Sequence, residues 1–592
     1  MKNQSEKIPN PAEIEKEISE FLSKKFGNSV KIVSPMMMAE PDAIHKDAEP
    51  PRSEAGIRFD LKPEELIAYL DRYIVKQDRA KAVLATKICT HFNRIKRAKA
   101  SGEAVSDLVG RIKNNVLLLG PTGVGKTYIV RLIAKKIGVP FVKGDATKFS
   151  ETGYVGGDVE DLVRDLVREA GNDIELAQYG IIYIDEIDKI AASKNIIGAD
   201  VSRSGVQRAL LKPMEETEVD LKVPHDPIAM LQEIERFRKT GKKERRVVNT
   251  ANILFIMSGA FNGLAEIVRK RIAKQEIGFG AHIRDHREDA DLLKHAGSED
   301  LIEYGFESEF VGRLPVRAIL DPLSVTDLFD ILKNPSNPII LGKRLDFDAY
   351  GIDVKFDDPA LDILARQAHT ENTGARGLVS AVENALMLFE KRLPSTSIRK
   401  FPVTAEVVEH PEAGLDALVA DNGRSAEEDF ERIRHSEKAS IKAYLEANRA
   451  LLVDRYSLKL TPSKMEIVAS YYSRHIMDIG QVLERIRGLY DDIKAIELEF
   501  YKHHDINIVL EEDAIDFVIG QLVSSETTTG QFAQGLSDNF ELGLKLAAEK
   551  TGKNRFFINR WALTHPDEYI RSLFRQAPTP PSSLQLERSD RS

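Results

Sequence analysis

The sequence is poor in cysteine and tryptophan, with one residue of each among 592. With Cys89 alone, the chain has neither an internal disulfide nor a multi-cysteine zinc site, as is typical of a reducing compartment. No apolar run approaches the ~20 residues that span a membrane. The first residues, MKNQSEKIPN, lack the apolar core of a signal peptide. We therefore expect a cytoplasmic protein with no zinc and no membrane segment.

A basic excess is also missing. Lys and Arg number 84 against 93 Asp and Glu, which gives a formal charge of −9. Proteins that coat nucleic acid need clustered basic side chains against the phosphates, so the balance argues against a nucleic-acid partner. Apolar residues make up 42% and charged residues 30%, a globular composition.

The length predicts several domains, at roughly 150 residues each. We expect an N-terminal helix with a linker in residues 1–57, a large α/β domain in 58–323, a small helical domain in 324–404, a helical extension in 405–576 and a disordered tail in 577–592. The helix rests on Ile14, Ile18, Phe21, Leu22 and Phe26, which recur at helical spacing.

Short apolar runs separate helical patterns in residues 58–323. They are NVLLLG (115–120), GIIYIDE (180–186) and NILFIMSGA (252–260). Runs that are apolar throughout suit strands covered on both faces, so we expect an α/β fold with a parallel sheet and flanking helices.

The C-terminal region is harder to interpret. A long helix is predicted from a capping box of Ser425 and Glu428. DINIVLEEDAID (505–516) resembles GIDVKFDDPALD (351–362) in its apolar spacing. Either residues near 505–550 are a degenerate second copy of the small domain, or two similar segments coincide, and the sequence leaves both interpretations open.

The segment GPTGVGKT (120–127) fits the GxxxxGK[ST] pattern of a phosphate-binding loop and lies between a predicted strand and a predicted helix. Its glycines allow backbone N–H groups to surround phosphates, Lys126 reaches the β- and γ-phosphates, and Thr127 is a candidate ligand of Mg²⁺. The candidate nucleotide-binding residues here are Gly120, Pro121, Thr122, Gly123, Val124, Gly125, Lys126, Thr127 and Tyr128.

Two carboxylates end the second apolar run. Asp185 at a strand tip beside a phosphate loop is a candidate for Mg²⁺ coordination, and Glu186 is a candidate base for the attacking water. The alternative, that the pair caps the following helix, loses weight because a phosphate loop precedes it. The combination predicts an ATP hydrolase.

Two arginines follow glycine-containing turns, Arg313 in EFVGRLPV and Arg376 in NTGARGL. A cation that stabilises the transition state at the γ-phosphate raises the rate by on the order of 10³–10⁵. Either arginine could instead be a surface ion-pair partner.

The segment SETGYVGGD (150–158) places Tyr154 and Val155 among glycines. A turn that packs its own tyrosine is one interpretation. A mobile loop that grips another molecule is the other.

Together, these motifs resemble the ClpX family of AAA+ protein unfoldases (Clp/Hsp100). The resemblance covers about 59–400, in the order GPTGVGKT, DATKFSETGYVGGDVEDLV, GIIYIDEIDKI, SGVQRALLK, ILFIMSGAFNGL, IGFGA, EDLIEYGFESEFVGRLPV and TGARGL. It implies an AAA+ large domain and a small lid domain. It also implies a homohexamer that uses ATP and Mg²⁺ to unfold and translocate unfolded or tagged proteins, and delivery of these substrates to a ClpP-type peptidase, without intrinsic peptidase activity.

The resemblance also implies residue roles. Asp185 would hold Mg²⁺, Glu186 would be the base, Arg313 would act in trans, and Arg376 and Ser258 would be sensors. The other implied positions are Ile74 and Val75 at the adenine, Tyr154 and Val155 in the substrate pore loop, and Ile277, Gly278 and Phe279 in the peptidase-docking loop.

The chain departs from the family pattern at four places. The N-terminal zinc domain is missing, and residues 405–592 have no counterpart. Lys76 replaces the usual glycine of the adenine loop, which predicts a loop of different shape. The basic segment 225–246 stands where the family has an Arg-Lys-His triplet; it is either an attractor of acidic tags or a solvated surface. A stand-alone remodelling ATPase is therefore the alternative, and a nucleic-acid motor is the third.

Overall fold

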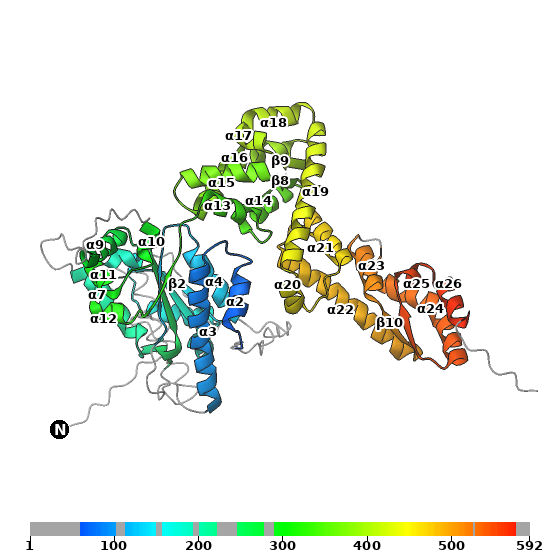
Figure 1. Cartoon of the computed structure of the whole chain (residues 1–592), viewed down its shortest axis with the longest axis horizontal. Coiled ribbons are helices and arrows are strands. Elements are labelled where there is room, and N and C mark those ends of the chain that lie inside the picture. Colours follow the sequence, from blue (N-terminus) through cyan, green and yellow to red (C-terminus); the bar gives the residue numbers. More distant parts are fainter. Residues whose placement is uncertain are drawn as a thin grey trace, which may run out of the picture. The chain divides into compact units, whose positions relative to one another are not determined.

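The computed structural model describes residues 60–101, 113–149, 157–192, 201–221, 246–276, 289–524 and 527–575 (Figure 1). None of the helices in these ranges combines the length and the apolar character of a membrane-spanning segment. The secondary structure falls into an α/β body (60–320), a first helical unit (α13 to α18), two connecting helices and a second helical unit (α21 to α26).

The α/β body is built on a five-stranded sheet of order β2-β3-β6-β1-β7, and all its pairings are parallel. The strands are β1 (Val116–Leu119), β2 (Phe141–Asp145), β3 (Ile181–Asp185), β6 (Leu254–Gly259) and β7 (Val316–Ile319). The predicted α/β class and parallel sheet are confirmed. The three apolar runs became β1, β3 and β6, at the centre of the sheet.

Both faces of the sheet are buried because side chains alternate between two cores. Leu117, Ile182 and Phe255 belong to one core, and Leu118, Ile181 and Ile256 belong to the other. The helices α2 (Pro63–Leu70), α3 (Asp78–Ser101) and α4 (Lys126–Ile137) cover one face (Figure 1). Helices on the opposite face are α5 (Asp161–Glu169), α7 (Val201–Met214), α9 (Leu264–Glu276), α11 (Ser298–Tyr304) and α12 (Ser308–Gly312).

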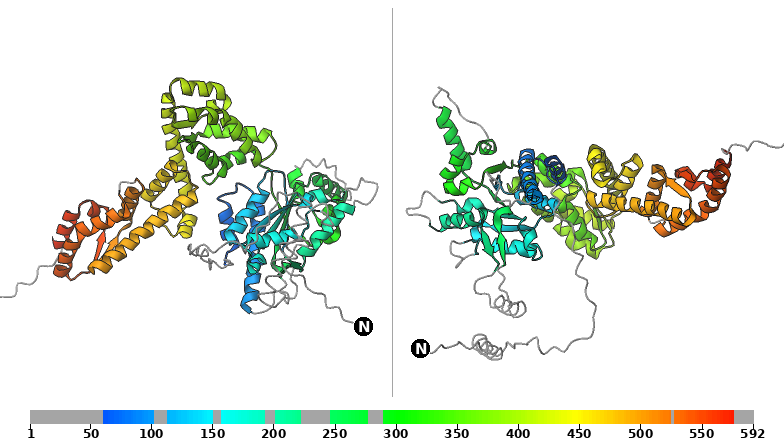
Figure 2. Two further views of the ribbon diagram at one scale, coloured as in Figure 1. Left: turned by 180° about the vertical axis from the view of Figure 1, so that it is seen from behind. Right: turned by 90° about the horizontal axis from the view of Figure 1, so that it is seen from below.

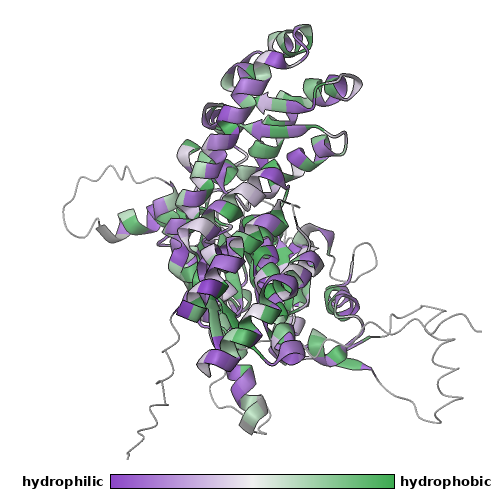
Figure 3. Ribbon diagram, turned by 90° about the vertical axis from the view of Figure 1, so that its right-hand side faces the viewer, coloured by the Kyte–Doolittle hydropathy of each residue, from purple (hydrophilic) through white to green (hydrophobic). Residues whose placement is uncertain are grey.

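The α/β body has several shorter elements. They are η3 (Ala146–Lys148), α6 (Ile174–Ala177), η4 (Ile187–Ile190), η5 (Thr250–Asn252), α10 (Asp289–Leu293), and an antiparallel pair of β4 (Glu218–Asp220) with β5 (Val247–Asn249). Most helices carry both polar and apolar residues, so their ribbons show both colours in Figure 3. This mixture is expected of helices with one face against a core.

The first helical unit contains α13 (Val325–Lys333), α14 (Pro338–Asp348), β8 (Asp353–Phe356), α15 (Asp358–Thr370), α16 (Ala375–Arg392), η7 (Leu393–Ser395), β9 (Lys400–Val403), α17 (Ala405–Glu409) and α18 (Pro411–Ala420). β8 and β9 pair in parallel. Phe389 stacks on Phe401 at 4.7 Å between ring centroids. The core reaches Val407 and Leu418, beyond the expected boundary at 404.

Two helices follow, α19 (Arg424–Ala447) and α20 (Arg449–Tyr456). The predicted capping box of Ser425 and Glu428 is wrong, because α19 already begins at Arg424, after a left-handed Gly423. Asp421 accepts the N–H groups of Gly423 and Ser425 at 2.9 Å each. An upstream aspartate therefore satisfies the helix start, and Ser425 lies inside the helix.

The second helical unit repeats the element order of the first, except for η7. It contains α21 (Pro462–Arg474), α22 (Ile479–His504), β10 (Asn507–Leu510), α23 (Glu512–Val523), α24 (Thr529–Thr551), β11 (Arg555–Ile558), α25 (Arg560–Thr564) and α26 (Pro566–Arg575). β10 and β11 also pair in parallel. The unit has its own apolar core, and Figure 2 shows it from two further sides.

Candidate functional site

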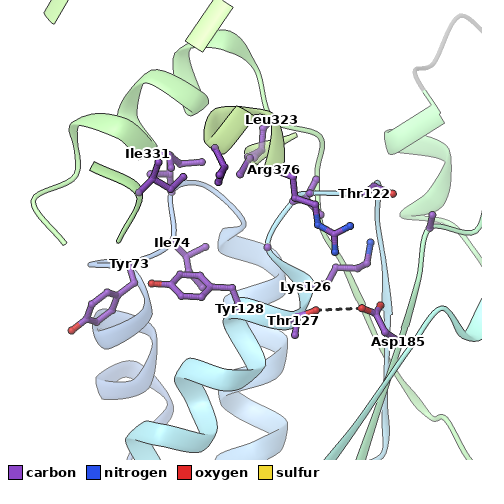
Figure 4. A pocket seen from close by; sticks show the side chains of 18 of the residues that line it. Tyr73, Ile74, Thr122, Lys126, Thr127, Tyr128, Asp185, Leu323, Ile331 and Arg376 are labelled. Atoms are coloured by element: carbon purple, nitrogen blue, oxygen red, sulfur yellow. Dashed lines mark hydrogen bonds between the residues drawn. The ribbon is translucent and has the colours of Figure 1, made fainter. Parts of the chain in front are cut away.

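A cavity of about 420 Å³ lies where the α/β body meets the first helical unit. Figure 4 shows its side chains. Its lining combines the phosphate-loop segment Thr122–Tyr128, the segment Tyr73–Val75, the strand-tip residues Asp185 and Glu186, and residues of the first helical unit such as Asn334, Asn337 and Arg376. Gly120 and Pro121 lie at the start of the same loop and accept hydrogen bonds from Lys126.

The loop between β1 and α4 has the backbone shape that phosphate binding requires. Gly123 and Gly125 have φ of 77° and 95°, which strongly favours glycine. Gly125 is the N-cap of α4, so the unpaired N–H groups of the first helical turn point toward the cavity end of the helix. Such a helix start is a favourable place for a phosphate group.

The first helical unit touches this loop backbone to backbone. The N–H of Ala375 donates to the carbonyl of Gly123 at 2.9 Å. A Cβ on Gly123 would lie 1.9 Å from the carbonyl oxygen of Thr373, and one on Gly374 (φ 62°) would lie 2.8 Å from that of Thr122. Only glycine at both positions allows this approach.

Lys126 extends along the loop, where its Nζ donates to the carbonyls of Gly120 and Pro121 at 2.7 Å each. Burial lowers the pKa of Lys126, while Asp185 and Asp188 act in the opposite direction and Arg376 adds to the decrease. An anion bound between Lys126 and Arg376 would offset the repulsion between these two cations.

Asp185 ends β3 at the centre of a polar network. It accepts from the hydroxyl of Ser258 at 2.6 Å, and the ammonium of Lys143 lies at 3.0 Å. Thr127 Oγ1 lies 3.5 Å from Asp185 (Figure 4) and 3.0 Å from the Tyr183 hydroxyl. Burial would raise the pKa of Asp185, but the bonds from Ser258 and Lys143 outweigh it and hold that pKa below its usual value.

The residues present fit a magnesium ion. Mg²⁺ usually binds through one or two protein oxygens and completes its shell with water and substrate phosphates. The hydroxyl of Thr127 and the carboxylate of Asp185 supply such a pair at the phosphate loop. Among the described residues no group of three or more His, Cys, Asp and Glu could hold a metal by itself.

Glu186 follows with a strained backbone. Its φ is 58°, an unusual value for a residue with a side chain, and it precedes η4. Such conformations cost of order 1–3 kcal/mol and cluster at functional sites. The side chain is exposed and lines the cavity. It is therefore free to meet water there.

The two candidate arginines lie in different places. Arg376, in the first turn of α16, points toward Lys126 across the cavity (Figure 4). Arg313 is outside this cavity. Its side chain is 50% exposed and pairs with Glu215 at 2.5 Å. Ser258 is also outside the lining, fully buried behind Asp185.

The far end of the cavity is apolar. Ile74 and Val75 line it together with Leu323, Ile331 and Ile339. Lys76, which replaces a glycine in the resemblance, adopts φ 59°, a value glycine readily adopts. Its Nζ bonds Asp327 and the carbonyl of Pro322, at 2.9 Å each. These contacts attach the segment Tyr73–Val75 to the start of the first helical unit, and whether the loop differs in shape from that of the family stays a prediction.

Several predicted residues lie outside the described ranges. They are Tyr154 and Val155 of the candidate pore loop, Ile277, Gly278 and Phe279 of the candidate docking loop, and all of the basic segment except Arg246. The predicted N-terminal helix and the C-terminal tail also lie outside.

Sequence reasoning missed other contributors. The hydroxyl of Tyr183 is 2.6 Å from that of Ser258. Tyr183 could have been predicted from the sequence, because a residue two positions before Asp185 on a strand lies on the same face. No sequence pattern indicated Lys143, because only the pairing of β2 with β3 brings it to Asp185. No pattern indicated Asn334 or Asn337 either.

Part of the chain is similar to known proteins. Residues 111–317 match the family profile described as "AAA domain (Cdc48 subfamily)". The chain is similar to the ATP-dependent Clp protease ATP-binding subunit ClpX of Treponema denticola, with 41% identity over 342 residues, 57% of this chain and 79% of the relative. It is 40% identical to the same subunit of Borrelia duttonii over 366 residues, 61% of this chain and 82% of the relative.

We predict that Gly374→Ala weakens ATP binding and lowers hydrolysis on the order of tenfold to a hundredfold, because misplacing a site by about 1 Å is that costly. The new Cβ would separate α16 and Arg376 from the phosphate loop. Gly351→Ala is the matched control. Gly351 also has a left-handed φ, of 72°, but its Cβ would meet nothing within 4 Å. Titration with a fluorescent ATP analogue and steady-state ATPase rates measure both. Equal effects of the two substitutions would show that backbone strain, and not the contact, matters.

Proposed function

Because the chain belongs to the ClpX family of AAA+ ATPases, we propose that it is an ATP-dependent protein unfoldase. It hydrolyses ATP to unfold polypeptides and to translocate them through a ring pore, and delivers them to a ClpP-type peptidase. The single observation that supports this most is the cavity in which the phosphate loop, the acidic strand tip and Arg376 meet. A site shared by two parts of the chain can turn hydrolysis into relative motion of those parts.

We assign the binding steps as follows. The N–H groups of the phosphate loop and Lys126 hold the phosphates of ATP, and the apolar end with Ile74 and Val75 takes the adenine. Thr127 and Asp185 hold Mg²⁺, which supplies charge neutralisation at the phosphates. Ser258 and Lys143 keep Asp185 ionised and oriented, through the contacts at 2.6 and 3.0 Å.

We assign hydrolysis to Glu186 and the arginines. Glu186 accepts a proton from the water that attacks the γ-phosphorus, and the bond from phosphorus to the β–γ bridging oxygen breaks. Arg376 stabilises the charge on the transferred group from the side of the first helical unit. Arg313 lies outside the cavity of its own chain and is half-exposed. We assign it to the ATP site of a neighbouring copy, as part of a homohexamer.

Two loops carry the mechanical part of the proposal. Tyr154 and Val155 grip the polypeptide in the pore, since a bulky amphipathic side chain pushes on any sequence. Ile277, Gly278 and Phe279 dock on the peptidase. A stand-alone remodelling ATPase remains the second candidate, because 57% to 61% of the chain aligns with the two relatives named above and α17 to α26 lie beyond the predicted lid.

Glu186→Gln should bind ATP with nearly unchanged affinity, lose most hydrolysis and hold substrate protein without releasing it. Loss of a general base costs on the order of 10²–10⁴ in rate. Glu266→Gln, an exposed glutamate on α9, is the control with wild-type turnover. Near-normal turnover of Glu186→Gln would remove Glu186 as the base.

Tyr154→Ala should retain ATP hydrolysis and lose unfolding, because the ring is what pushes on the polypeptide. Loss of fluorescence of a tagged fluorescent protein measures unfolding, beside the ATPase rate. Tyr154→Phe, which keeps the ring, should unfold at close to the wild-type rate. Unfolding by the alanine variant at that rate would contradict the pore-loop role.

Phe279→Ala should lose a ClpP-type peptidase in a pull-down and should keep ATP-dependent unfolding, because the phenylalanine is assigned only to docking. Tyr350→Ala, which removes an exposed aromatic from the first helical unit, is the matched control. If wild-type protein captures no peptidase at any concentration tested, the stand-alone remodelling ATPase becomes the better description.

A further inference from the structure

The two helical units share more than their element order. In the strand that precedes α17 or α25, Phe401 and Val403 of the first unit correspond to Phe556 and Ile558 of the second, and all four point into a core. In both units a His-Pro pair follows, His410–Pro411 and His565–Pro566. The second unit is therefore a structural repeat of the first, residue by residue at this strand.

The connecting helix α19 covers the outward face of the two-stranded sheet of the first unit and contacts both β8 and β9. Lys400 and Pro402 are the outward residues of β9. Lys400 Nζ binds Glu427 at 2.8 Å and Glu431 at 3.2 Å, both on α19. It also lies 5.7 Å from the ring centroid of Phe430, which is only 1% exposed. Two acidic residues and one aromatic residue of α19 thus hold this helix on β9 through Lys400.

The neighbouring strand β8 contributes a third acidic contact. Outward-pointing Lys355 is 1% exposed, and its Nζ binds Glu437 of α19 at 2.7 Å. Lys355 also donates to the carbonyl of Ser473 at 2.7 Å. The covering helix is therefore amphipathic, with carboxylates directed at the cations of the sheet.

In the second unit the equivalent face is open. Arg555 and Phe557 of β11 take the places of Lys400 and Pro402. Phe557 is 52% exposed, and the Arg555 guanidinium lies 5.2 Å from its ring centroid. Within the described ranges Arg555 has no ion-pair partner, and no helix lies across β10 and β11 as α19 lies across β8 and β9.

We propose that the outward face of β10 and β11 binds an acidic amphipathic helix of a partner protein. The chemistry of the helix follows from the occupied copy where the two faces correspond. Arg555 keeps the positive charge of Lys400 and calls for carboxylates in adjacent turns. Phe557, and Val509 in the place of Lys355, call for apolar or aromatic side chains beside them. A cation beside an exposed aromatic on a sheet favours such a helix over a basic or a purely apolar one. The second unit is thus an adaptor that recruits proteins to the ATPase.

The test uses the full chain and a known helix as probe, a labelled peptide with the sequence of residues 424–447 (RSAEEDFERIRHSEKASIKAYLEA). Anisotropy of the label gives its dissociation constant. Trp561, the only tryptophan of the chain, lies three residues after β11, and the peptide has none. A change in tryptophan emission on peptide binding therefore reports on the second unit.

We expect saturable binding that Arg555→Glu and Phe557→Ala each weaken by about tenfold or more, because one reverses the charge and the other removes the apolar contact. A peptide with Glu427→Lys and Glu431→Lys should bind wild type poorly and Arg555→Glu better. One control should leave binding unchanged: Arg571→Glu, an equal charge change at an exposed position of α26.

Three results would overturn the proposal. One is the absence of saturable binding by wild type. Another is equal binding of the charge-reversed peptide, which would mean that the face does not select acidic helices. The third is self-association of the chain that Phe557→Ala abolishes while the peptide does not compete, which would make a second copy the occupant.

Discussion

The site depends on one close contact, the approach of the α16 N-terminus to the phosphate loop. The N–H of Ala375 donates to the carbonyl of Gly123 at 2.9 Å. A Cβ on Gly123 or on Gly374 would push the two backbones apart. This contact fixes where Arg376 lies relative to Lys126. The cavity has a cation on each side only while the first helical unit is seated on the loop. Nucleotide binding and the position of that unit are therefore linked.

How much of the site could be predicted depended on how local its determinants are. Residues 120–127 and 181–186 carry their chemistry in contiguous patterns, so the sequence indicated the phosphate loop, Asp185 and Glu186. Lys143 reaches Asp185 only because β2 pairs with β3. Lys76 is another non-local case. Its contact with Asp327 joins two segments 251 residues apart, and a left-handed backbone at a lysine has no local sequence signal.

For the fold, apolar periodicity was sufficient at the centre of the sheet and insufficient elsewhere. The strands β1, β3 and β6 are apolar throughout, whereas β2 (FVKGD) and β7 (VRAI) include charged residues and were not named. The spacing shared by 351–362 and 505–516 indicated β8 with α15 and β10 with α23. It carried no information on the outward faces, because those depend on whether a distant helix covers them.

The two helical units differ where the first one meets the nucleotide cavity. Helix α16 is preceded by the N-cap Gly374, which has no side chain to cap the helix and so leaves room for another backbone. Helix α24 is preceded by the N-cap Thr528, whose hydroxyl accepts the N–H of Gln531 in a complete capping box. The residue equivalent to Arg376 is Gly530. A self-capped helix start without a cation offers nothing to a phosphate loop. The second unit keeps the scaffold without the nucleotide contact, which leaves its surface, with Arg555 and Phe557, as the part that can act.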